Sequence, residues 1–131
     1  MQQQLCYQKN IMIVNNNPDT VNDLQELFKS HGFQVTIADN SRRCLLELEK
    51  GFHGIIIFGH NLPSMDGIAT IRKMWTEGFI NQNTIIMLTS ERIQGEEFDE
   101  IYPYIYDIII KPYDNNAVLN IIKKITQQSS P

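Results

Sequence analysis

The sequence predicts an α/β domain built on a doubly wound, five-stranded parallel sheet with helices on both faces. Two observations predict this fold class. Short apolar runs of strand length alternate along the chain with amphipathic segments whose apolar residues recur at helical spacing. Several of the apolar runs are hydrophobic at consecutive positions, as in strands that are buried on both faces. Five successive units of this kind favour parallel strands joined by crossover helices.

Five segments are predicted to be strands. The first is an uninterrupted run of isoleucine, methionine and valine, and the third and fifth are rich in consecutive isoleucines, as expected for buried parallel strands. The second strand alternates between apolar and polar residues, which is the pattern of a strand with one buried face. The predicted strands are residues 11–14, 33–38, 55–58, 84–89 and 108–110.

The segments between the first strands carry helix signals. Asn17 is predicted to cap the first helix, with Pro18 at its first position, and Gly32 ends that helix. Ser41 is predicted to cap the second helix, which ends at Gly51. The expected apolar positions of the first three helices are Val21, Leu24, Leu27 and Phe28, then Cys44, Leu45 and Leu48, then Ile68, Ile71, Met74 and Trp75.

The last two helices differ in the strength of their signals. Residues 91–100 are acidic and contain Gly95, which costs about 1 kcal/mol relative to alanine inside a helix, so we expect a short or imperfect fourth helix there. Asp114 is predicted to cap a more regular last helix. The apolar positions of that last helix are Val118, Ile121, Ile122 and Ile125.

Length and composition narrow the range of functions. The 131 residues predict a single domain, with a core from about residue 10 to 126 and a polar tail at 127–131 that resembles the start of a linker. The net charge of −4 gives no support for nucleic-acid binding by this domain. The apolar runs are far shorter than the roughly 20 residues of a membrane span, and the N-terminus lacks a signal-peptide pattern. Cys6 and Cys44 predict reduced thiols, so we expect a cytoplasmic protein without a membrane contact.

The predicted topology also indicates where to look for a site. Open parallel sheets bind their ligands outside the carboxyl ends of the strands, where the strand order reverses. The residues that end the predicted strands or directly follow them are Asn15, Asn16, Gly59, Thr89 and Lys111. The pattern alone therefore makes these five residues the candidates for a functional site.

These residues and the loop after the third strand resemble the receiver domain of response regulators in two-component signalling. The loop at residues 62–67, of sequence LPSMDG, is the most specific match, and the likeness extends over almost the whole chain. Thr89 matches the hydroxyl residue of the family, and Lys111 with Pro112 matches its phosphoryl-contacting lysine and the proline that follows it. The resemblance implies a flavodoxin-like fold and a role in phosphorelay signalling.

The sequence departs from the receiver pattern at its acidic positions. The acceptor aspartate of the family falls on Gly59, and the acidic pair that holds Mg²⁺ falls on Asn15 and Asn16. Asn61 takes the position that lends a backbone carbonyl to the metal, and Ile108 the switch position that is usually aromatic. Because phosphoryl transfer needs the acceptor and the metal, the resemblance implies a pseudo-receiver. It is expected to lack phosphorylation at position 59, to have lost Mg²⁺ and other cofactors, and not to be an enzyme.

Other interpretations of these positions stay open. Gly59 could be a tight-packing glycine at a strand end, without any functional meaning. Asp66, inside the matched loop, could serve as a substitute acceptor in a working receiver. A small ligand-binding or enzymatic α/β domain is a third alternative, although the chain has no Gly-rich phosphate loop and no G-x-S-x-G motif. We expect Thr89 and Lys111 to bind an inorganic anion weakly near the N-terminus of the first helix. The alternative is that Lys111 bonds to asparagine side chains and backbone carbonyls.

A module that is not phosphorylated is expected to act through protein contacts. Tyr104 and Tyr106 are predicted to lie on the face formed by the fourth helix, the fifth strand and the fifth helix, where receivers bind partners and dimerise. Tyrosine is enriched at such interfaces because it buries a large area and keeps a polar end. The expected partner is a histidine kinase-like or effector protein, a linked effector domain, or a second copy in a homodimer.

Overall fold

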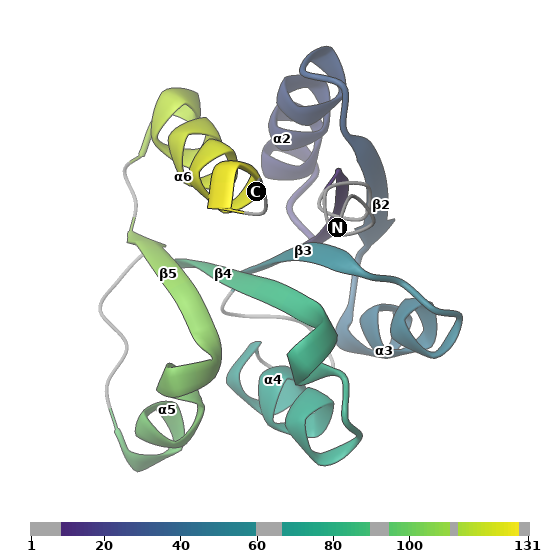
Figure 1. The fold of residues 1–131 in the computed structure, drawn as a ribbon, viewed down its shortest axis with the longest axis vertical. Helices are drawn as coiled ribbons and strands as arrows, with labels where there is room; N and C mark the ends of the chain where they lie inside the picture. The colour runs from purple at the N-terminus through teal and green to yellow at the C-terminus, as the bar shows by residue number, and fades with distance from the viewer. Residues whose placement is uncertain (1–8, 60–66, 90–94, 111–112, 129–131) are drawn as a thin grey trace.

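The fold was obtained as a computed structural model, which describes residues 9–59, 67–89, 95–110 and 113–128. Within these residues five strands form one parallel sheet in the order β2-β1-β3-β4-β5 (Figure 1). This arrangement confirms the predicted fold class. The strands are β1 (Asn10–Val14), β2 (Gln34–Ala38), β3 (Gly54–Gly59), β4 (Asn83–Thr89) and β5 (Ile105–Ile110).

The described helices cover both faces of the sheet (Figure 1). α2 (Pro18–Ser30) and α6 (Asn115–Gln128) lie on one face. α3 (Ser41–Glu49), α4 (Gly67–Thr76) and α5 (Glu96–Ile101) lie on the other. Short 3-10 helices precede β4, at Ile80–Gln82, and β5, at Tyr102–Tyr104. None of the helices in the described part of the chain is both long and apolar enough to cross a membrane.

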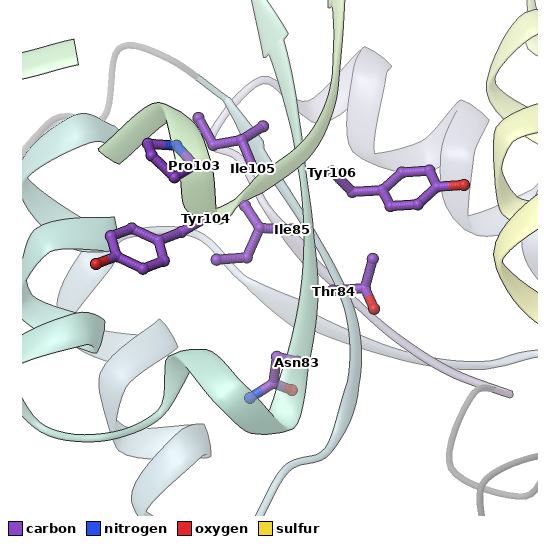
Figure 2. Close-up of a pocket in the computed structure, with 7 residues that line it drawn as sticks. All are labelled: Asn83, Thr84, Ile85, Pro103, Tyr104, Ile105 and Tyr106. Atoms are coloured by element: carbon purple, nitrogen blue, oxygen red, sulfur yellow. The ribbon is translucent and has the colours of Figure 1, made fainter. Parts of the chain in front are cut away.

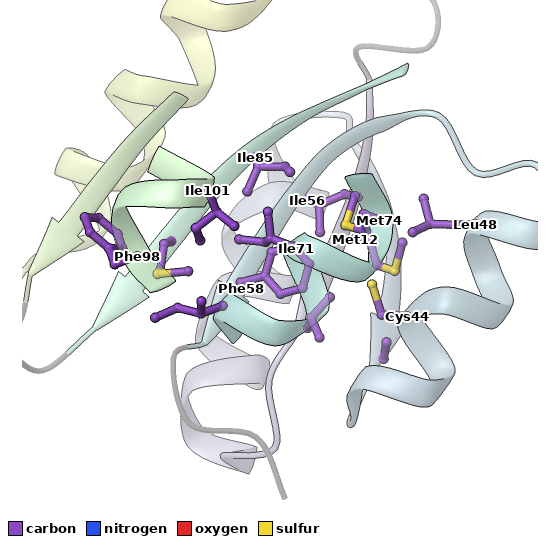
Figure 3. Packing of buried hydrophobic residues seen from close by; sticks show 14 residues of the cluster. Met12, Cys44, Leu48, Ile56, Phe58, Ile71, Met74, Ile85, Phe98 and Ile101 are labelled. Carbon is purple, nitrogen blue, oxygen red and sulfur yellow. The ribbon is translucent and has the colours of Figure 1, made fainter. Parts of the chain in front are cut away.

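The central strands explain the uninterrupted apolar runs of the sequence. Ile56 and Phe58 of β3 belong to the core under α3, α4 and α5 (Figure 3). The alternate residues Ile55 and Ile57 belong to the second core, under α2 and α6. All four side chains are buried, so β3 is covered on both faces, as a central parallel strand must be.

The reversal of strand order lies between β1 and β3. The chain leaves β1 for the edge strand β2 and then returns past β1 to β3. In the register, Val14 at the end of β1 pairs with Phe58. The next residues, Asn15 and Gly59, therefore lie side by side at the carboxyl edge of the sheet, where open α/β sheets carry their sites.

The helix caps confirm two predictions and correct a third. Asn17 caps α2, because its Oδ1 accepts a hydrogen bond from the backbone N–H of Thr20 at 3.1 Å. Asp114 accepts in the same way from the N–H of Ala117 at the start of α6, at 2.8 Å. The prediction for Ser41 was wrong, since Asn40 caps α3. Ser41 is buried as the first residue of the helix and accepts a hydrogen bond from Thr70 of α4 at 2.6 Å.

Three further details differ from the expected elements. β5 begins at Ile105, three residues before the predicted start. The fourth helix, α5, is short as expected, with six residues, but Gly95 precedes it with a φ of 119° instead of lying inside it, a conformation that glycine adopts without strain. Trp75 leaves the predicted apolar stripe of α4 and is 55% exposed, because Ile71 and Met74 already fill the buried side of that helix.

We expect Asn17→Ala to lower the free energy of unfolding by about 1 kcal/mol, because the N–H of Thr20 loses its acceptor. Urea denaturation measures this change. The matched control is Asn120→Ala, at an exposed position inside α6, where alanine is the better helix former and stability should not fall. Equal losses in both variants would contradict the capping role.

Cys44 provides a second test of the core. It is fully buried, and this burial raises the pKa of its thiol to about 12, so almost no thiolate forms near neutral pH. In a Cys6→Ser background, Cys44 should react with a disulfide reagent only as fast as the protein unfolds. Rapid native-state labelling, at the rate seen in denaturant, would show that the core under α3 is open.

Candidate functional site

The candidate site begins where β1 and β3 end side by side. Asn15 is the first residue after β1, and its backbone N–H donates to the carbonyl oxygen of Ala38 at the end of β2, at 3.0 Å. Gly59 is the buried last residue of β3 and pairs with Leu88 of β4. The two positions are neighbours because the residues just before them, Val14 and Phe58, pair directly between β1 and β3.

The side chain of Asn15 lies directly over Gly59. Its Oδ1 accepts a hydrogen bond from the backbone N–H of Asn17 at 2.9 Å, within the turn that leads into α2. This bond leaves the amide nitrogen facing β3. A Cβ atom at position 59 would lie 3.0 Å from Nδ2 of Asn15 and 3.3 Å from its Cγ, which is closer than Cβ atoms normally approach other atoms. The amide therefore takes the space in which a side chain at position 59 would begin.

The described groups at positions 15, 16 and 59 do not fit the coordination that Mg²⁺ prefers. Mg²⁺ in proteins is usually held through one or two carboxylates together with waters and phosphates. Positions 15, 16 and 59 supply two neutral amides and a glycine. The amide oxygen of Asn15 is already bonded to a backbone N–H, and the nitrogen that faces Gly59 is a hydrogen-bond donor. Across the described ranges, no three His, Cys, Asp or Glu residues group closely enough to hold a metal ion.

Other predicted site residues are described only in part. Asn61, Asp66 and Lys111 lie outside the described residues. The backbone of Thr89 ends β4, the strand next to β3, and pairs with Ile110, but its side chain is not described. The strand ends thus bring position 89 close to position 59, and the anion site at Thr89 and Lys111 stays a prediction.

The switch position lies on the edge strand. Ile108 pairs with Met87 of β4 and is partly buried against the core under α4 and α5. A branched aliphatic side chain there adds apolar contact to that core. The Ile108 side chain has no polar group, so it cannot form a hydrogen bond in either a buried or a solvent-exposed orientation.

Tyr104 and Tyr106 point to opposite sides of the edge strand β5, whose two sides are flanked by α5 and α6. Tyr104 stacks on Trp75 of α4, with 5.9 Å between ring centroids and 26° between ring planes. Tyr106 points to the opposite side of β5 (Figure 2) and is 39% exposed. The pairing of β4 with β5 skips one residue at this point, and Tyr106 is the extra residue of that bulge. A partner role for either tyrosine stays a prediction.

Sequence reasoning missed the contact between Asn15 and Gly59 as well as the exposed stack of Trp75 on Tyr104. The only signal for the contact between Asn15 and Gly59 was that both neighbouring strand ends lack the acidic residues of the receiver pattern. That signal shows neither the distance between the two residues nor the orientation of the Asn15 side chain. No pattern in the sequence indicated the second, because a tryptophan at helical spacing from isoleucines reads as a core residue.

The chain is similar to receiver domains in sequence and structure. The family model described as the response regulator receiver domain matches residues 11–123. A CheY-like receiver domain protein from Methanospirillum hungatei has a TM-score of 0.84, with 26% identity over 92% of this chain and 95% of that chain. The receiver domain of a Pseudomonas aeruginosa sensor histidine kinase, solved with a magnesium ion coordinated in its active-site cleft, has a TM-score of 0.78 and 21% identity. It covers 90% of this chain and 97% of its own.

Two curated relatives differ in how much of their length is matched. A putative two-component response regulator of Arabidopsis thaliana is 21% identical over 121 residues, which is 91% of this chain but 29% of that protein. An uncharacterized 14.6 kDa protein of Leptolyngbya boryana is 23% identical over 121 residues, or 92% of each chain. The chain therefore spans less than a third of the first relative and nearly all of the second.

We expect Gly59→Ala to be about 1 kcal/mol more unfavourable in the native background than in an Asn15→Ala background, because only the native amide opposes the new Cβ. A double-mutant cycle of urea unfolding energies measures this coupling. The matched control pairs Gly59→Ala with Asn10→Ala, at the far end of β1, where the two effects should add. Additivity in both cycles would mean that Asn15 does not occupy the space at position 59.

Proposed function

The chain belongs to the family of response regulator receiver domains, and we propose that it works in two-component signalling by protein contact, without phosphorylation at position 59. The observation that carries the proposal is the packing of the Asn15 amide over Gly59. It supports a site in which the acceptor is absent and its space is filled from the neighbouring strand.

Phosphoryl transfer to a receiver depends on positioning and charge neutralisation. The transferred group carries several negative charges, which a metal ion normally offsets, and it must end on a nucleophile. Glycine has no nucleophilic side chain, and the asparagines at the acidic-pair positions are neutral. We therefore propose that Mg²⁺ is not bound here, and that the domain catalyses no phosphoryl transfer to itself.

Signalling must then draw on another source of free energy. A ligand shifts a conformational equilibrium only by as much as its affinity differs between the two states. In this chain a protein partner would supply that difference. A histidine kinase-like protein, an effector protein or a linked effector domain would each fit the role.

The proposal predicts that incubation with acetyl phosphate and Mg²⁺ leaves the intact mass of the native protein unchanged. A receiver domain that keeps its acceptor aspartate, treated in the same way, serves as the positive control and should gain the mass of one phosphoryl group. Mass spectrometry of the intact chain under acidic conditions measures both, because acylphosphates survive poorly at alkaline pH.

A mass gain of one phosphoryl group in the native protein would contradict the proposal. The same reaction with Asp66→Asn would then identify the acceptor. Loss of the gain in that variant would establish a working receiver with a non-standard acceptor, which is the alternative that the sequence leaves open.

A further inference from the structure

Two side-chain contacts on the outer surface join α4 to α5 and to the 3-10 helix that follows α5. Arg72 of α4 forms an ion pair with Glu100 of α5, with 2.9 Å between the charged atoms. One turn further along α4, Trp75 stacks on Tyr104. Beneath them, Phe98 and Ile101 of α5 belong to the same buried cluster as Ile71 and Met74 of α4 (Figure 3). The two helices are therefore fixed relative to each other, and the surface above their junction is preorganised.

Aromatic rings lie open on this surface. Trp75 is 55% exposed even though it is stacked, and Tyr102 is 59% exposed while its ring meets Phe98 edge-on at 5.6 Å. Rings this large are mostly buried in proteins, and exposed aromatic groups of this kind mark interaction surfaces. Their contacts with Tyr104 and Phe98 hold both rings in place, which reduces the entropy that a partner must overcome on binding.

A shallow hollow lies at the amino ends of β4 and β5 (Figure 2). It has a volume of about 400 Å³, and Tyr104, which stacks on Trp75, is one of its lining residues. The hollow adjoins the β5 bulge and offers both hydroxyl and apolar groups. Its lining residues are Asn83, Thr84, Ile85, Pro103, Tyr104, Ile105 and Tyr106.

The helix that borders this surface, α5, is strongly acidic. α5 has the sequence EEFDEI, in which every residue apart from Phe98 and Ile101 is acidic. Glu96 and Asp99 are exposed and lie three residues apart, so they occupy one side of the helix. Glu100 is the member of this group that Arg72 pairs with. Asp99 also precedes Tyr102 by three residues, so its negative charge adjoins an exposed ring.

We propose that this acidic aromatic surface, formed by Trp75, Tyr102, Tyr104, Glu96 and Asp99, docks an arginine-bearing segment of a partner protein. A guanidinium group stacks on aromatic rings and pairs with carboxylates at the same time, because it is planar and always charged. A second copy of this chain fits less well, because it would bring a like-charged helix against α5. The inference names a partner chemistry for the contact function proposed above and rests on that function.

Trp75 is the only tryptophan of the chain, so its fluorescence reports directly on this surface. The probe is a short synthetic peptide of alternating arginine and serine, titrated into the full chain at low salt. We expect a saturable change in Trp75 fluorescence that weakens as salt is added. The same peptide with lysine in place of arginine should bind about fivefold more weakly, because an ammonium group does not stack, and a glutamate version should not bind.

Charge-reversal variants separate this surface from the general negative charge of the protein. Glu96→Lys combined with Asp99→Lys should weaken binding of the arginine peptide about tenfold or more. The control Glu26→Lys combined with Glu49→Lys, at exposed positions of α2 and α3, changes the net charge by the same amount and should change binding by less than about twofold, as screening allows. Tyr102→Ala should also weaken binding, whereas Leu46→Ala, a similarly exposed apolar position on α3, should not.

Three results would overturn the inference. The first is no saturable change in fluorescence with the arginine peptide up to about 1 mM. The second is an equal loss of affinity in the double variant of Glu26 and Glu49 and in the α5 double variant, which would mean that the net charge of the protein alone drives binding. The third is a dimer in sedimentation that Trp75→Ala abolishes, which would identify a second copy as the occupant. The acetyl phosphate reaction tests the absence of phosphorylation separately, so either proposal can fail without the other.

Discussion

The close approach of the Asn15 amide to Gly59 is the constraint on which the site depends. It arises from topology, because the sheet order makes β1 and β3 neighbours and ends both strands at one edge. Hydrogen bonds then connect Asn15 to the helix that follows β1. Asn15 accepts from the N–H of Asn17, and Asn17 accepts from the N–H of Thr20, so the strand end, the turn and the first turn of α2 form one bonded unit. A side chain at position 59 would press on the Asn15 amide at the start of this unit.

The exchange of carboxylates for amides also changes what the fold needs for stability. Carboxylates that converge on one site repel one another unless a cation or hydrogen-bond donors offset their charge. Neutral amides at the same positions remove that repulsion, and the hydrogen bond to Asn17 satisfies the oxygen of Asn15 inside the protein. Neutral amides at positions 15 and 16 need no bound cation to offset their charge.

The sequence predicted most of the fold because the relevant signals are local. Apolar runs located the central strands, and the Asn17-Pro18 pair located the start of α2. The errors came from tertiary contacts. Serine is a common N-cap residue, but the side chain of Ser41 is buried against Thr70, and Asn40 caps α3 instead. The exposure of Trp75 and the direction of the bulge residue Tyr106 depend on how α4 and β5 pack, and the spacing of residues in the sequence does not encode that packing. At the site, the residue types could be read from the sequence, but the orientation of the Asn15 side chain could not.

Magnesium binding to the native chain and to a variant with restored charges tests the central claim most directly. Calorimetric titration of MgCl₂ into the native protein should show no saturable heat. The variant Asn15→Asp, Asn16→Asp, Gly59→Asp, confirmed as folded by circular dichroism, should bind one ion saturably, because carboxylates then replace the amides on an intact scaffold. Saturable binding of Mg²⁺ by the native protein, as tight as that of the variant, would contradict the account.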